Sequence, residues 1–201
     1  MDITMNLLFL VIFGYLFCKF VQVLVKMKQP IILPKDDAER VGIRKHPPKA
    51  LDAPTPAKQK SGIITHGLVY LLVFAVFILG IFSDSIGWQQ YLLLLVICIV
   101  PGFYNLLNLF AVIEDGILSG SKFIPWKKIK SYRFVSIDVN HRFYGHVRKV
   151  NNKYELKIKM TLFSTSVVVI SREMKHKLHH VFNEHEIYDN SNSGKGEPYS
   201  G

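Results

Sequence analysis

The sequence is short of cysteine and lacks the short motifs that mark common enzyme and metal sites. Its 201 residues contain two cysteines, Cys18 and Cys98, both inside apolar segments, so a disulfide framework is excluded. No CxxC pair, glycine-rich phosphate loop, GxSxG elbow or HExxH helix is present. We therefore expect a protein that is not an enzyme and that binds no cofactor.

Charged residues are nearly absent from three long blocks. The block 3–25 contains one charge, Lys19, and the blocks 63–82 and 91–112 contain none. At about 1.5 Å per residue, a helix of this length spans roughly 30 Å, which is the thickness of a bilayer core. The first block is not a typical signal peptide, because it begins Met-Asp and runs into VLVKMKQP. The pattern predicts three transmembrane helices: one N-terminal helix (1–25), then a hairpin (63–112).

Basic residues are distributed unevenly between the connecting loops. The loop 26–62 holds nine Lys/Arg against four acids, and fifteen further Lys/Arg follow residue 112, whereas the connector 83–90 holds only Asp84. Short loops rich in Lys/Arg remain cytoplasmic. We therefore expect a multi-pass protein of the cell membrane with its N-terminus outside and with residues 26–62 and 113–201 in the cytoplasm.

Two features of the apolar half suggest irregular or polar contacts. The loop 26–62 contains six prolines and no sustained period, which predicts an irregular basic linker. In the third block Pro101-Gly102 is expected to bend the helix, and Asn105 and Asn108 lie on one helical face. These two amides are candidates for interhelical polar contacts. A transport path along them would require oligomerisation, because three helices are too few.

The period changes from helix to strand after residue 112. YELKIKMTL (154–162) alternates apolar and polar residues, as a half-buried strand does, and STSVVVIS (164–171) predicts a more buried strand. Weaker strands are expected at 117–124, 129–137 and 143–150. Ser171 is a candidate N-cap for a helix over 171–185, whose apolar stripe consists of Met174, Leu178, Val181 and Phe182. Residues 189–201 are expected to be disordered.

Three segments of this half carry a family resemblance. IEDGIL, KFIPWKKIKSYRF and VVVISREMKHKLHHVF together resemble bacterial pleckstrin-homology-like (PH-like) domains attached to membrane hairpins, as found in small bacterial membrane proteins. The resemblance implies an α plus β membrane protein in which residues 113–188 form a small antiparallel PH-like sheet or partial barrel with a C-terminal helix. It also implies that Phe123, Trp126 and Ile129 belong to the core, with a corner turn between Trp126 and Ile129.

Two clusters of polar residues are candidates for binding. The first is a basic surface for lipid or a partner, whose charges otherwise serve only to set the topology: Lys122, Lys127, Lys128, Lys130 and Arg133. The second is the histidine group His176, His179 and His180, which falls short of a stable metal site because too few ligands share one face. Nucleic-acid binding is not expected, because membrane topology already explains the positive charge.

These observations favour a non-enzymatic integral membrane protein whose cytoplasmic domain acts as an adaptor or regulator. Its expected partners are membrane lipids, anionic ones in particular, or another membrane protein, and a homo-oligomer remains open. Two alternatives are an immunity protein against a peptide toxin made by the same cell and a small transporter-associated subunit.

Overall fold

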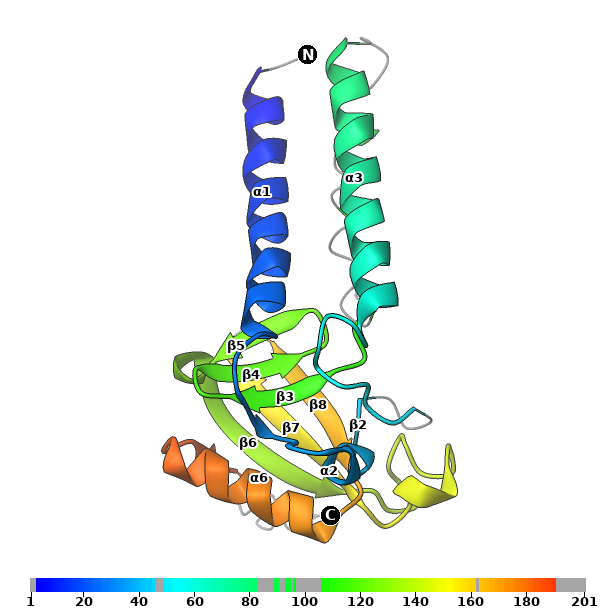
Figure 1. Cartoon of the computed structure of the whole chain (residues 1–201), viewed down its shortest axis with the longest axis vertical. Coiled ribbons are helices and arrows are strands. Elements are labelled where there is room, and N and C mark those ends of the chain that lie inside the picture. The colour runs from blue at the N-terminus through cyan, green and yellow to red at the C-terminus, as the bar shows by residue number, and fades with distance from the viewer. Residues whose placement is uncertain are drawn as a thin grey trace, which may run out of the picture. The chain divides into compact units, whose positions relative to one another are not determined.

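The computed structural model describes residues 3–45, 49–82, 89–90, 93–94, 96, 106–161 and 163–190 (Figure 1). They belong to two compact units. The first comprises residues 1–29, 54–108 and 120–123, and the second comprises residues 30–53, 109–119 and 124–201.

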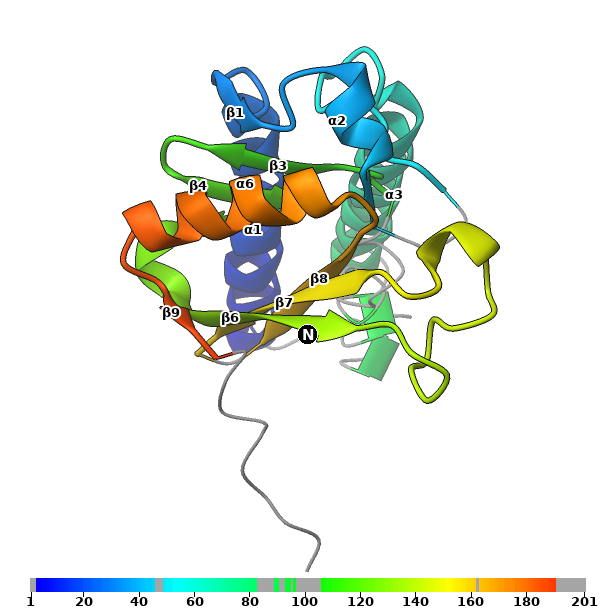
Figure 2. The same cartoon turned by 90° about the horizontal axis from the view of Figure 1, so that it is seen from below.

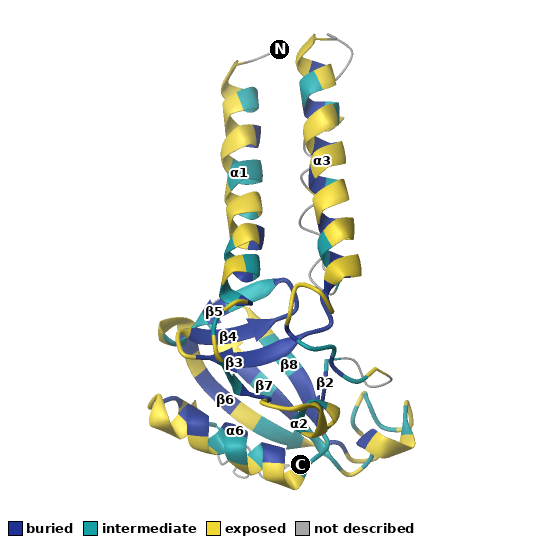
Figure 3. Ribbon diagram, viewed as in Figure 1, coloured by how far each residue is buried: buried dark blue, intermediate teal, exposed yellow. Residues whose placement is uncertain are grey.

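The first unit is built on two long antiparallel helices, α1 (Ile3–Lys26) and α3 (Lys60–Phe82). Phe9, early in α1, stacks on Phe77, late in α3, with ring centroids 4.2 Å apart, and Phe20 stacks on His66 at 4.8 Å. Much of the remaining helix surface is exposed (Figure 3), and many of its exposed residues are large hydrophobic ones. Both helices are long and apolar enough to cross a membrane. The first two predicted spans are therefore confirmed as helices.

The third predicted span is wrong at its C-terminal end. Phe110–Ile113 is a strand, β3, and all four of its residues are buried. A short apolar run fits a buried strand as well as a helix, and periodicity does not separate the two. Between α3 and residue 106, the structure describes only residues 89, 90, 93, 94 and 96, which are helical. The predicted bend at Pro101-Gly102 lies outside the described residues.

The second unit contains two sheets and a C-terminal helix. The four-stranded sheet has the order β1-β3-β4-β5, and the five-stranded sheet has the order β2-β8-β7-β6-β9. The pairs β1–β3, β3–β4, β2–β8, β7–β8 and β6–β7 are antiparallel. The pair β6–β9 is parallel. The remaining bounds are β1 Ile31–Leu33, α2 Asp37–Val41, β2 Ile43–Arg44, β4 Gly116–Ser119, β5 Lys122–Pro125, η1 Trp126–Lys128, β6 Ile129–Ser136, η2 Arg148–Val150, β7 Tyr154–Met160, β8 Ser164–Val169, α6 Arg172–Glu184 and β9 Tyr188–Asp189.

The core of this unit lies between the inner faces of the sheets and α6. Figure 2 shows α6 running between the two sheets in the view from below. Its stripe Met174, Leu178, Val181 and Phe182 is buried, as predicted, and packs with Leu156 and other residues of both sheets. The Ser171 hydroxyl accepts a hydrogen bond from the Met174 N–H at 3.3 Å, so the predicted N-cap is confirmed. The described strands form two separate sheets and not one closed barrel.

The expectation of an irregular linker over 26–62 is wrong for residues 31–44. Ile31 pairs with Ile113, and Ile43 pairs with Val169, so this segment adds one edge strand to each sheet. Asp36 caps α2 between them by accepting from the Glu39 N–H at 2.8 Å. The prolines hid these elements because Pro30 and Pro34 directly flank a strand of three residues, too short to show a period.

Of the elements predicted after residue 112, some are confirmed, one strand is divided in two and one strand is wrong. Strands β6, β7 and β8 and helix α6 confirm four predicted elements. The predicted strand 117–124 is two strands, β4 and β5, because the chain turns at Gly120, where φ is +58°. The predicted strand 143–150 is wrong, since this segment is a loop ending in η2. The tail begins with ordered β9, and residues 191–201 lie outside the described part of the chain.

Candidate functional site

The five predicted basic surface residues do not form one cluster within one unit. Lys122 lies on β5 and belongs to the unit of the helices. The other four belong to the second unit: Lys127 and Lys128 on η1, and Lys130 and Arg133 on β6, all four exposed. Each group must therefore be considered with its own neighbours.

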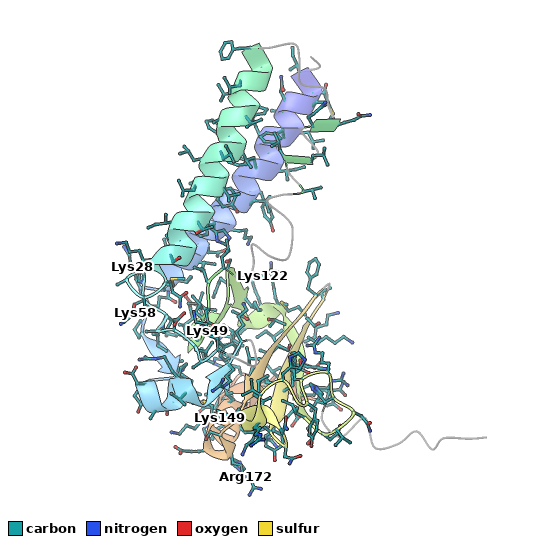
Figure 4. The ribbon with its side chains drawn as sticks, turned by 90° about the vertical axis from the view of Figure 1, so that its right-hand side faces the viewer. Lys28, Lys49, Lys58, Lys122, Lys149 and Arg172 are labelled. Atoms are coloured by element: carbon teal, nitrogen blue, oxygen red, sulfur yellow. The ribbon has the colours of Figure 1, made fainter. Side chains whose placement is uncertain are left out.

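A set of lysines gathers at one end of the helix pair. Lys26 ends α1 and Lys60 begins α3, and the antiparallel arrangement puts both at the same end. Lys28, Lys58 and Lys122 lie at this end too (Figure 4). The Lys26 ammonium group lies 5.2 Å from the Phe123 ring centroid, which ties the 120–123 turn to α1. We call this set the basic collar: Lys26, Lys28, Lys58, Lys60 and Lys122.

The chain after the apolar blocks is attached to the same end of α3. The Gln59 side chain accepts from the Asn108 N–H at 3.1 Å and donates to the Asn108 carbonyl at 3.3 Å. Gly62 makes a close approach possible, because a Cβ there would lie 2.5 Å from the Leu106 carbonyl oxygen. Asn108 is therefore not part of a helix, so its predicted place on a helix face is wrong, and its backbone hydrogen-bonds with the Gln59 side chain. Asn105 lies outside the described residues.

The corner at Trp126 joins β5 to β6 through η1. The Trp126 indole donates to the Glu114 carbonyl at 2.7 Å, and its ring stacks on His185 at 3.9 Å and meets Phe182 edge-on. Trp126 is half-buried against the core, and Ile129 is buried. The predicted corner and the place of Ile129 are confirmed, whereas Phe123 is half-buried and belongs to the other unit.

Replacing this tryptophan should weaken the second unit. Trp126→Ala removes the indole hydrogen bond and two ring contacts, so we expect the free energy of unfolding to fall by about 2 kcal/mol, less than for a fully buried Trp. Thermal unfolding of the full chain in detergent, followed by circular dichroism, measures this. Lys127→Ala, next to it and exposed, should change stability by less than about 0.5 kcal/mol. Equal melting of the two variants would contradict this account of the corner.

Strand β7 carries a buried carboxylate, Glu155, although the alternation of the sequence predicted a solvent-exposed side chain at this position. Glu155 is fully buried, because the 137–153 loop covers this part of the five-stranded sheet with a small apolar cluster around Ile137, Val150 and Val168. Its carboxylate is 2.6 Å from the Arg142 guanidinium, 3.0 Å from His141 Nε2 and 3.2 Å from the Lys157 ammonium. We call these four residues the Glu155 cluster.

Opposing effects act on the pKa of Glu155. Burial alone would raise it, but hydrogen bonds from Ser166, Arg142 and Lys157 outweigh burial and hold the pKa below its usual value. The carboxylate is therefore the charged centre that fastens the loop to the sheet. Strand alternation predicted an exposed Glu155, and no local signal in HRFYGH marked His141 and Arg142 as its partners.

The predicted histidine group is divided between different partners. His179 Nδ1 lies 2.7 Å from the Tyr132 hydroxyl, and His180 pairs with Glu184 at 3.3 Å. Burial, followed by the nearby Asp189 carboxylate, raises the pKa of Tyr132 to about 12, so its hydroxyl stays protonated and donates to Asn183 at 3.0 Å. In the described part of the chain, no three His, Cys, Asp or Glu side chains are grouped to hold a metal ion.

The architecture is therefore that of an α plus β protein with two apolar helices, two largely antiparallel sheets and a C-terminal helix. Residues 108–187 match a family model described as a domain of unknown function, DUF5673. The match begins at Asn108, which hydrogen-bonds with Gln59, and ends at Ile187, just after α6. It does not include β1, α2 or β2, which precede α3 in the sequence. No curated protein and no solved structure matches the chain.

Proposed function

We propose that the protein is a non-enzymatic, multi-pass protein of the cell membrane whose strand-rich unit works in the cytoplasm as an adaptor or regulator. The observation that carries this proposal is the basic collar: lysines from two helix ends and from the 120–123 turn meet at one end of an apolar helix pair. Loops rich in lysine stay on the cytoplasmic side. Each lysine near an anionic leaflet also contributes about 1 kcal/mol of attraction.

The proposed topology has the N-terminus outside and a third crossing. The chain leaves α3 at Phe82, yet Leu106 lies beside Gly62 in the first turn of that helix. A helix of this length measures roughly 35 Å. We propose a return crossing between residues 82 and 106, which the position of Leu106 beside the start of α3 supports.

We propose a PH-like scaffold for the second unit. The two antiparallel sheets closed by one C-terminal helix support this, as does the corner at Trp126. Such a scaffold carries binding surfaces on its loops and edges, so its partners would be anionic lipid or another membrane protein. The lack of catalytic motifs in the sequence favours binding over catalysis.

Cysteine labelling in intact cells tests the proposed topology. On a background of Cys18→Ala and Cys98→Ala, single cysteines are introduced by Lys58→Cys, Ile86→Cys and Lys195→Cys. A membrane-impermeant maleimide should label only position 86 from outside, and permeabilisation should expose the other two. Labelling of position 58 or 195 in intact cells would overturn the proposed orientation and the role of the collar.

A further inference from the structure

The face of the five-stranded sheet opposite α6 presents a regular array of basic and hydroxyl side chains. Arg133 on β6 pairs with Lys157 on β7, which pairs with Ser166 on β8. The next row of the same face is Ser131, Lys159 and Ser164. We call these two rows the outer face. Their neighbours along the strands, Leu156 and Ile158, point the other way into the core.

Two of the three cations on the outer face are available to a ligand. Lys157 shares its charge with the buried Glu155 at 3.2 Å. Arg133 and Lys159 are exposed, and neither forms an ion pair with any residue in the described ranges. Arg142, which holds the buried Glu155, also donates to the Ser166 hydroxyl at 3.3 Å, so the loop reaches the first row only at Ser166 in the described contacts. The net charge of the outer face is therefore positive.

The outer face is hollowed beside the turn from β7 to β8. A shallow depression of about 430 Å³ is lined by Arg133, Lys157, Lys159, Ser131, Ser164 and Asn190. Phe163 stands at its rim, with 67% of its surface exposed, and the Met160 N–H donates to the Phe163 carbonyl at 2.8 Å to close the turn. A large aromatic side chain thus projects next to unpaired cations and hydroxyl donors.

We propose that the outer face binds the phosphate groups of anionic phospholipids, with Phe163 at the bilayer interface. Arginine and lysine donate charge-assisted hydrogen bonds to phosphate oxygens, and the exposed Ser164 hydroxyl adds a further donor. A projecting aromatic beside cations suits a membrane interface, where the ring enters the headgroup layer. The inference rests on the proposed function, which holds this unit next to a leaflet.

A fluorescent probe on the β7–β8 turn tests the proposal in the full chain. Thr161→Cys, on the background without Cys18 and Cys98, carries an environment-sensitive dye, and the protein is reconstituted in nanodiscs. With phosphatidylcholine alone the dye should report water. With phosphatidylglycerol added, we expect a blue shift and quenching by lipids brominated in the acyl chain.

Substitutions of the cations and of Phe163 test whether the outer face is responsible for docking to anionic lipid. Arg133→Gln with Lys159→Gln should weaken the docked state about 30-fold, since each cation near anionic lipid is worth a change of about fivefold. Lys127→Gln with Lys128→Gln makes the same change in net charge on η1 and should leave most of the docking. Phe163→Ala should reduce the quenching, and circular dichroism checks that it stays folded.

Three results would overturn the proposal. They are an unchanged dye signal when phosphatidylglycerol is added, equal losses in the two double variants, and saturable binding of a soluble acidic or phosphorylated peptide that is abolished by Arg133→Gln with Lys159→Gln. The cysteine-labelling pattern does not depend on Arg133 or Lys159. Failure of the lipid inference is therefore distinguishable from failure of the proposed topology.

Discussion

Replacing Glu155 by alanine should lower the free energy of unfolding of the second unit by about 3 kcal/mol. The change removes three contacts to Arg142, His141 and Lys157 and opens a space beneath the 137–153 loop. The loss stays below the upper range for broken buried pairs, because the Arg142 side chain is 62% exposed and can turn to water once its partner is gone. Denaturant unfolding of the full chain in detergent, with its midpoint and slope, measures the loss.

The same carboxylate should make stability depend on acid. Its pKa lies below the ordinary value of 4.5 in the folded protein, so its contribution is complete above that pH and is lost as the pH falls through the folded pKa. Glu155→Gln should remove this part of the acid dependence while nearly keeping the shape of the side chain. Unfolding curves collected from neutral pH downward compare the two proteins.

A matched control is available on α6. Glu173 is also paired with a lysine, Lys177, at 2.6 Å, but its side chain is 75% exposed. Glu173→Gln should therefore change stability by less than about 0.5 kcal/mol. If both glutamine variants behaved alike, Glu155 would not be the residue that fastens the loop.

Replacing Gly116 by alanine should cost about 3 kcal/mol, because its Cβ would meet backbone and not a flexible side chain. Gly116 begins β4, and a Cβ there would collide with the Ile124 carbonyl oxygen and lie 2.8 Å from the Pro125 Cα. Backbone atoms of β5 cannot move aside as the end of a side chain can, so β4 and β5 must separate where β4 begins at Gly116. Thermal unfolding by circular dichroism measures the loss.

Gly145 provides the comparison for backbone strain without a clash. It has φ of +80°, yet nothing lies within 4 Å of the position of its Cβ. Gly145→Ala should therefore cost about 1 kcal/mol, from the left-handed conformation alone. If Gly116→Ala were no more harmful than Gly145→Ala, the close approach of β4 and β5 would not determine the effect.

The match to the family model also has a structural consequence. It begins at residue 108, whereas both sheets take an edge strand from residues 31–44. The segment before α3 therefore belongs to the fold of the second unit, although a long helix separates the two in sequence. Fragments that begin at residue 108 lack these edges, which exposes the backbone of β3 and β8 to other chains.

The sequence by itself determined the features that depend on local composition and period. Long apolar blocks, with Lys19 as their one charge, specified α1 and α3, strict alternation specified β7, and the stripe at Met174 and Leu178 with Ser171 before it specified α6. Each of these signals is complete within one element.

Only the tertiary structure decided how distant segments share one environment. β1 and β2 form because Ile31 and Ile43 meet strands more than eighty residues away, and a strand of two or three residues carries no period of its own. Glu155 is buried because a loop that follows a different strand folds over it. Arg133 and Lys159 share one face through strand register, which is fixed by pairing and not by composition.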